Sequence, residues 1–252
     1  MIIYNGKNLE DFSVEAIGRG RYGSPARDIE QVHVPGLNGD LLFDSGGFLN
    51  ATVEYPDCCI DHDFPTNFAA LRTFLLADPG YHRLEDSYAS DEFRMAEFRG
   101  PLTPDVHTGR GNRSGTFTLQ FNATPQRYLK EGGEEREIHD QEIVENKWMP
   151  ANPIFRIIPG ANKKVGISIH GIVIEGSVSG FSVTDNTGSD TMIYEIDMIH
   201  GTAVRYEESS YLRKYNAASS VEGDIFTIPP GKYQWGISGT GQVFVKPMFW
   251  RI

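Results

Sequence analysis

Residues Gly18–Gly23 read G-x-G-x-x-G, a pattern that could support nucleotide binding. In dinucleotide-binding folds these glycines open a helix, and the N-terminus of that helix binds the pyrophosphate. Here Ser24-Pro25 follows, and then a strand pattern runs from Asp28 to Val34. Because no helical pattern follows the glycines, the segment indicates a basic loop between strands.

Two further groups could bind a metal ion or support redox chemistry. Asp61-His62-Asp63 offers carboxylate and imidazole ligands, but three adjacent side chains on a strand cannot all converge on one ion. Cys58 and Cys59 are the two cysteines, and neighbours on a strand point to opposite faces, so a disulfide between them would be strained. We predict two free thiols, at least one of them buried, and no metal or cofactor.

The groups that acid-base or nucleophilic catalysis requires are also missing. Glu85 and Asp86 are adjacent, whereas a glycosidase needs two carboxyl groups that face each other across a cleft. The seven histidines are scattered, and neither G-x-S-x-G nor H-E-x-x-H occurs in the sequence. These observations predict a protein that is not an enzyme.

The amino-acid composition indicates which secondary structure the chain forms. In 252 residues there are 27 Gly and 14 Pro, which favours short strands and turns. One segment, about Asn67 to Leu76, has the apolar spacing of a helix. We therefore expect a mainly β protein.

The net charge of −11 argues against binding to a nucleic acid backbone or to an anionic membrane. No apolar run approaches the roughly 18 residues that span a bilayer, so we expect no membrane insertion. The N-terminal residues lack the pattern of a signal peptide, and the two thiols suit a reducing cytosol. We therefore expect synthesis in a cytoplasm.

The most strongly patterned stretch is Arg27–Tyr55. Its alternating segments flank a turn at Pro35–Asp40, which contains Asn-Gly, and a second corner is predicted at Asp44–Gly47. Residues 81–100 predict a hairpin-like pair with a turn near Tyr88–Asp91. The second arm of this pair suits either contact with another subunit or an ordinary half-exposed strand, and the pattern does not decide between them.

An acidic shift in composition from Glu131 to Trp148 indicates a domain boundary. We predict a first domain at 1–132, an acidic linker or connecting strand at 133–150, and a second domain at 151–252. The second domain contains about eight short alternating segments separated by turn residues, which indicates a jelly-roll β-sandwich.

Several ordered pieces together resemble the distal tail protein family of siphophages and their prophages. No single piece is specific, but their order and spacing extend over nearly the whole chain. In the first half they are Arg27–Glu30, Val34–Leu41, Asp44–Gly46, Asn50–Tyr55, Gly80–Tyr88, Arg94, Phe98–Gly100, Phe117–Phe121 and Pro125–Lys130; in the second they are Asn152-Pro153, Ile196-Asp197, Gly223–Phe226, Pro230–Lys232 and Pro247–Trp250. One departure is Leu37, where the family would have a basic residue.

The resemblance implies a fold and a role. The fold is an N-terminal β-sandwich or split barrel with one α-helix and a hairpin extension, followed by a galectin-like β-sandwich. The role is structural: a hexameric ring at the virion tail tip, with a lumen through which DNA passes. The ring would join the tail tube protein to the tail-associated adhesion or lysin protein, and its periphery could carry receptor-binding proteins.

Candidate contact residues follow from this reading. For the ring interface we select Arg27, Asp28, Asn38, Asp40, Arg83, Glu85, Asp86, Arg94 and Phe98. An alternative function is a carbohydrate-binding β-sandwich, because sugars stack on exposed aromatic rings. The residues that could serve a sugar or a partner are Tyr206, Tyr211, Tyr233 and Trp235, with Tyr215 and Trp250 nearby in sequence. The same residue types commonly fill a sandwich core, and the sequence leaves both readings open.

Overall fold

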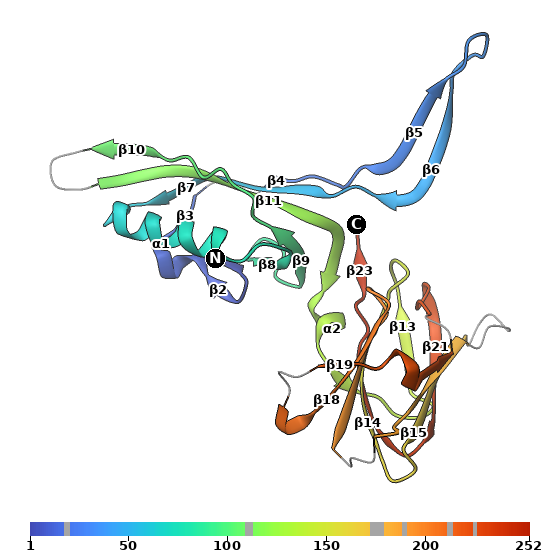
Figure 1. The fold of residues 1–252 in the computed structure, drawn as a ribbon. Helices are drawn as coiled ribbons and strands as arrows, with labels where there is room; N and C mark the ends of the chain where they lie inside the picture. Colours follow the sequence, from blue (N-terminus) through green and yellow to red (C-terminus); the bar gives the residue numbers. More distant parts are fainter. Residues whose placement is uncertain (18–20, 109–112, 172–178, 188–190, 211–213, 224–225) are drawn as a thin grey trace. The chain divides into compact units, whose positions relative to one another are not determined.

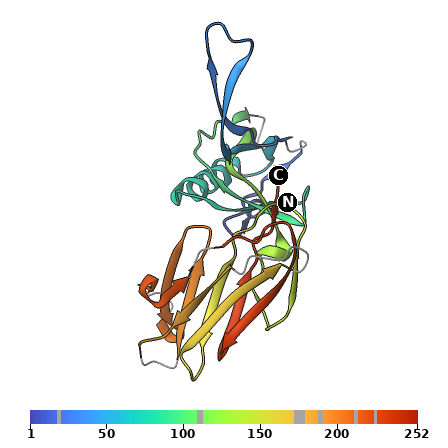
Figure 2. The same ribbon diagram turned by 90° about the vertical axis from the view of Figure 1, so that its right-hand side faces the viewer.

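The computed structural model describes residues 1–17, 21–108, 113–171, 179–187, 191–210, 214–223 and 226–252. The chain divides into two compact units, Met1–Arg127 with Ile252, and Tyr128–Arg251 (Figures 1 and 2). Strands dominate both units, which confirms the mainly β prediction. In the described part, no helix combines the length and apolarity that a membrane crossing requires.

The first unit contains a large antiparallel sheet, a separate hairpin and the helix α1. Its elements are β1 (Ile2–Tyr4), β2 (Lys7–Asn8), the 3₁₀ helix η1 (Leu9–Phe12), β3 (Glu15–Ala16), β4 (Arg21–Tyr22), β5 (Arg27–His33), β6 (Asp40–Phe48), β7 (Ala51–Ile60), α1 (Phe64–Ala77), β8 (His82–Asp86), β9 (Glu92–Glu97), β10 (Asp105–Thr108) and most of β11 (Arg113–Leu129). The main path of the sheet is β2-β1-β8-β9-β11-β7-β3, and β4 pairs with β7. The predicted turn near Tyr88–Asp91 indeed joins β8 to β9.

The core of this unit lies between the sheet and α1. Alternating side chains of the paired strands β7 and β11 point into it, and Val53, Leu119 and Phe121 are fully buried. Helix α1 packs Leu71 and Leu75 against them, as the apolar spacing predicted. The helix begins earlier than predicted because Pro65 is tolerated in a first helical turn, where its missing N–H costs no hydrogen bond.

Both cysteines are free and buried, as expected. Cys58 belongs to the core of the first unit, and burial raises the pKa of its thiol to about 12. Cys59 is the next residue on β7, so its side chain leaves the opposite face of the strand. The two thiols therefore have different surroundings.

The second unit is a sandwich of two antiparallel sheets. Its elements are α2 (Lys130–Gly133), β12 (Arg136–Glu137), β13 (Ile143–Asn146), β14 (Ile154–Pro159), β15 (Lys164–Gly171), β16 (Ser179–Thr184), β17 (Met192–Asp197), β18 (Thr202–Glu207), η2 (Glu208–Ser210), β19 (Tyr215–Asn216), η3 (Ala218–Ser220), β20 (Val221–Gly223), β21 (Gly231–Gly239), β22 (Gly241–Lys246) and β23 (Trp250–Arg251). One sheet has the order β12-β22-β14-β17-β18-β19, and the other has the order β13-β21-β15-β16-β20.

Aromatic rings from both sheets meet in the core of the second unit. The Phe155 ring on β14 lies 5.3 Å from the Phe181 ring on β16 and 5.8 Å from the Trp235 ring on β21, measured between centroids. Both contacts are edge-to-face, a favourable arrangement of two ring quadrupoles. These contacts join one sheet to the other.

The segment 133–150, expected to be a separate linker or connecting strand, lies inside the second unit. It supplies β12 to one sheet and β13 to the other. Ile138 and Val144 are buried in the core, and each lies next to one of the acidic residues that suggested a linker. The acidic composition of the segment as a whole therefore did not indicate that these two apolar residues are part of the core.

One buried carboxylate anchors the second unit. Asp185 follows β16 and accepts hydrogen bonds from the Thr187 hydroxyl (2.6 Å), the Thr187 backbone N–H (2.9 Å) and the Tyr194 hydroxyl (2.9 Å). Burial raises the pKa of this carboxyl, but the hydrogen bonds outweigh burial and hold the pKa below its usual value. The ionised form is therefore favoured in the folded unit.

This anchor predicts an acid-dependent loss of stability. A group whose pKa is lower in the folded state stabilises the fold above its unfolded-state pKa, and that stabilisation is lost as the pH falls. Asp185→Asn should lower the free energy of unfolding at pH 7 by about 1–3 kcal/mol, and it should flatten the dependence below pH 5. Denaturant unfolding followed by tryptophan fluorescence reports on this unit, because all three tryptophans lie within 128–251.

The matched control is Glu222→Gln, which removes a carboxylate that is exposed. It should leave both the stability and its pH dependence unchanged. Equal acid sensitivity of Asp185→Asn and the unaltered protein would contradict the role of Asp185.

Candidate assembly surface

No residue of the β5–β6 hairpin belongs to the core cluster found among the described residues of the first unit. It forms a two-stranded sheet of its own, and its strands pair from Arg27 opposite Phe48 to His33 opposite Asp40. The hairpin projects away from the larger sheet in Figures 1 and 2. An isolated two-stranded hairpin is at best marginally stable in water, so this element needs further contacts.

The predicted turn at Pro35–Asp40 closes the hairpin. Gly36 and Gly39 both have φ of +90°, in the region that favours glycine, and nothing lies within 4 Å of a Cβ built on either one. The backbone N–H of Leu37 donates to the carbonyl oxygen of Val34 at 3.1 Å. Backbone conformation, and not crowding, therefore requires these glycines.

The second predicted corner, Asp44–Gly47, is wrong. These residues lie inside β6, where the register shifts between Arg27 and Ile29 on the facing strand. The Asp44 side chain accepts a hydrogen bond from the Gly46 N–H at 2.8 Å, and Gly46 has φ of +78°. The glycines therefore form a bulge that bends one long strand without ending it.

Both faces of the hairpin carry exposed apolar side chains. Directly paired residues share a face, so Val32 lies with Leu41, and Phe43 lies on the same face. Ile29 and Leu42 lie on the other face. Phe43 is 56% exposed and Leu42 is 61% exposed, which is unusual for large apolar side chains on adjacent positions. Neither face is covered by the described part of the chain.

Polar side-chain contacts link the two strands at both ends of the hairpin: an ion pair at the base and a hydrogen-bonded His–Asp pair near the tip. At the base, Arg27 Nη1 lies 3.1 Å from Asp44 Oδ2, and the Arg27 guanidinium lies over the Phe48 ring at 5.2 Å. Near the tip, His33 Nδ1 lies 3.1 Å from Asp40 Oδ1. These predicted interface residues thus first serve the hairpin itself, while Asp28 and Asn38 are also exposed on it.

Three more predicted interface residues lie on β8. Arg83 Nε lies 2.5 Å from Glu85 Oε1, and the Arg83 guanidinium lies 4.1 Å from the centroid of the Phe93 ring. The Tyr55 hydroxyl donates a hydrogen bond of 2.7 Å to Asp86. Asp86 also accepts from two backbone N–H groups of the following turn, so the turn holds it in place.

Arg94 and Phe98 do not offer a surface to a neighbouring subunit. Phe98 is only 6% exposed and packs in the core of the first unit. Arg94 is also buried, and burial followed by the charge of Arg127 lowers the pKa of its guanidinium. Arg127 in turn binds the buried Glu92 at 2.6 Å. Side chains on both faces of β9 are largely buried, so the alternation of polar and apolar residues along this strand does not identify an exposed face.

The aromatic residues chosen for sugar or partner contact do not form one exposed platform. Trp235 is fully buried in the second core, and Tyr206 is buried as well. Tyr233 is half-buried, and its hydroxyl donates to the Pro230 carbonyl at 3.3 Å. Tyr211 lies outside the described residues. The structure therefore assigns Trp235 to the core.

Tyr215 and Trp250, the two aromatic residues near this set, differ in their surroundings. Tyr215 is exposed on β19, at the end of its sheet. Trp250 is half-buried, and its Nε1 donates to the Pro150 carbonyl at 2.8 Å. The described aromatic side chains thus lie in separate places.

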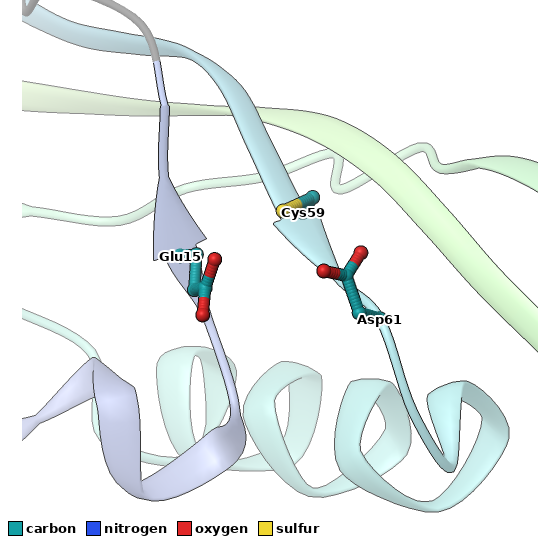
Figure 3. A group of neighbouring side chains, drawn as sticks. All are labelled: Glu15, Cys59 and Asp61. Carbon is teal, nitrogen blue, oxygen red and sulfur yellow. The ribbon is translucent and has the colours of Figure 1, made fainter.

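The remaining motifs are also separated. Residues 18–20 of the glycine pattern lie outside the described residues, while Arg21–Tyr22 forms β4 and no helix occurs between β4 and β7 in the described part. His62 Nε2 lies 3.2 Å from the Ser13 hydroxyl, and Asp63 precedes α1. Asp61 instead lies near Glu15 and Cys59, a grouping that only strand register reveals (Figure 3).

We compared the chain with known protein families, curated proteins and solved structures. No model of a protein family and no curated protein matches the chain. Among solved structures, the SPP1 Dit protein matches over 97% of this chain and 96% of its own length, with 14% identity and a TM-score of 0.62. That protein is described as a paradigm of the hub adsorption apparatus in phages that infect Gram-positive bacteria.

The phage P2 baseplate in its activated conformation also matches, in structures with Ca and with Sr. Each covers 91% of this chain and 90% of the matched chain, with identities of 9% and 10% and a TM-score of 0.48. The SPP1 match extends over both units of the chain. The protein therefore has the Dit-like fold that the sequence resemblance implied.

The tip geometry predicts that the two turn glycines are required for the hairpin. In the double variant Gly36→Val and Gly39→Val, a β-branched residue would occupy φ of +90° twice, at a cost of about 1–3 kcal/mol each. Hydrogen exchange should accelerate across residues 27–48 and stay unchanged in β7 and β11. The control is Gly47→Val, at a glycine whose φ is not positive and whose added Cβ would meet no atom within 4 Å; it should keep the normal protection of the hairpin from hydrogen exchange. Unchanged exchange in the double variant would contradict this requirement.

Proposed function

We propose that this chain is a structural subunit of a phage tail tip that assembles into a ring, with six copies expected. The ring would join the tail tube protein to the tail-associated adhesion or lysin protein, and it would carry receptor-binding proteins at its periphery. The chain would have no catalytic role; it would be synthesised in the host cytoplasm and become part of the virion tail. The Dit-like fold supports it.

The uncovered hairpin is the observation that carries this proposal. Exposed apolar side chains on both faces, including Leu41, Leu42 and Phe43, are costly in a subunit that remains alone. Among the described strands, none pairs with either outer edge of the hairpin, so backbone N–H and C=O groups there lack strand partners. A neighbouring copy would cover the apolar faces and satisfy the edges together.

The placement of the extensions within the first unit favours a ring over a two-fold dimer. The β5–β6 hairpin lies at one end of this unit, and β10 with the start of β11 lies at the other end (Figure 1). A contact between different ends of successive copies is heterologous, and such contacts close into a ring when the rotation permits. The first unit would therefore form the ring.

The charge of the chain suits a passage for DNA. Each copy carries −11, so six copies would carry about −66, and acidic walls repel a phosphate backbone. DNA would therefore pass through the lumen without being retained.

The first test is the mass in solution. Light scattering or native mass spectrometry at micromolar concentration should give a closed oligomer with a mass six times that of one 28.1 kDa chain. A monomer at every concentration, including mixtures with tail tube or adhesion proteins, would overturn the ring.

The second test removes the proposed contact without disturbing the core. Phe43→Glu and Leu42→Glu each place a charge on one face of the hairpin, and each should weaken association by about 100-fold. The melting temperature of the separated subunit should not change, because neither side chain packs in the core. Association is measured by sedimentation across a dilution series.

The matched control is Leu76→Glu, which changes a leucine that is 50% exposed on α1. It should leave association intact. If all three variants associated equally, the hairpin would not be the contact that holds the ring.

A further inference from the structure

Glu15, Cys59 and Asp61 lie together at the edge of the first unit's sheet (Figure 3). Glu15 is directly opposite Cys59 in the antiparallel pair of β3 and β7. Asp61 lies two residues beyond Cys59, and positions i and i+2 of an extended segment face the same side. Strand register therefore brings Glu15 close to Cys59 and Asp61, although they are far apart in the sequence.

The three ligand atoms have the separations of a small ion site. One carboxylate oxygen from each acid and the Cys59 Sγ all lie within 4.8 Å of one another. Ligands of a tetrahedral Zn²⁺ ion, at about 2.0–2.3 Å from the metal, lie about 3.6 Å apart. Small rotations of the two exposed carboxylates would suffice to reach these separations. The ligands come from β3, from β7 and from the segment after β7.

The thiol is the distinctive part of this group. Cys59 is only 4% exposed, yet it does not belong to the apolar core that contains Cys58. Its neighbours inside the group are the two carboxyl groups, and in the described part of the chain neither carboxylate pairs with a basic side chain. A bound cation would stabilise a buried thiol that lies beside two carboxylates, which carry no basic partner among the described residues.

We propose that Glu15, Cys59 and Asp61 bind one Zn²⁺ ion, with water as the fourth ligand. A thiolate excludes the hard cations Ca²⁺ and Mg²⁺, which prefer oxygen ligands, and two carboxylates with one thiolate suit a borderline ion. Binding forms one Zn–S and two Zn–O bonds to the protein, while the hydrated ion releases all but one of its water ligands. The thiol proton leaves to solvent, and no electron is transferred.

The ion would cross-link the sheet edge. β3 is two residues long and makes only two register pairs with β7, Glu15 with Cys59 and Ala16 with Cys58. A metal bond between β3 and β7 would fix this short edge strand, and ligand binding to the folded state raises its stability. All three proposed ligands belong to one chain, so metal binding can be tested on the separated subunit.

Cobalt is the probe that tests the site. The protein is treated with a chelator under reducing conditions and then titrated with Co²⁺, which should give a thiolate-to-cobalt charge-transfer band that Zn²⁺ abolishes at one equivalent. Cys59→Ser should remove the band. Glu15→Gln changes an exposed residue and should weaken binding about tenfold or more, since even changes around metal ligands cost 10–100-fold.

The control is Cys58→Ala, which keeps all three proposed ligands and should keep the band. Zn²⁺ should raise the melting temperature of the unaltered protein and of Cys58→Ala, but not that of Cys59→Ser. The absence of a band in the unaltered protein, or an equal rise with Zn²⁺ in Cys59→Ser and the unaltered protein, would overturn the site.

Discussion

The antiparallel pairing of β7 with β11 is the interaction on which the first unit depends. Val53, Leu119 and Phe121 from this pair are fully buried, and α1 packs against them. One side of the pair continues through β9, and the other continues through β3 and β4. The chain leaves the sheet after β4, forms the β5–β6 hairpin and returns as β7. The hairpin is thus held at its base by the ladder that organises the core.

The mainly β fold, α1 and the Pro35–Asp40 turn follow from local signals. Apolar spacing identifies Leu71 and Leu75 as one helix face, and a turn with two glycines closes the hairpin. The same local signals did not identify the structure of Asp44–Gly47. A glycine with positive φ and an Asp side chain that accepts a backbone hydrogen bond are typical of both a turn and a β-bulge. Only the facing strand distinguishes them.

Exposure was harder to predict than secondary structure. Leu41, Leu42 and Phe43 are consecutive apolar residues, a pattern typical of a buried strand, yet they face solvent in the single chain. Phe98 and Trp235 are buried although they suited a contact surface equally well. Periodicity reports which side chains share a face, but it does not report what covers that face. The Glu15–Cys59 pairing likewise depends on register between distant strands.

The open edges of the hairpin also bear on solubility before assembly. A ribbon with apolar faces and unpaired edges is a template for uncontrolled strand addition, which leads to aggregation. Charged residues interrupt the apolar positions along it, among them Asp28, Glu30 and Asp40. Such residues act as gatekeepers, because a stacked copy would bring like charges together. The acidic side chains of the hairpin therefore restrict which strands can pair with it. The hairpin can bind a matching partner and still repel others.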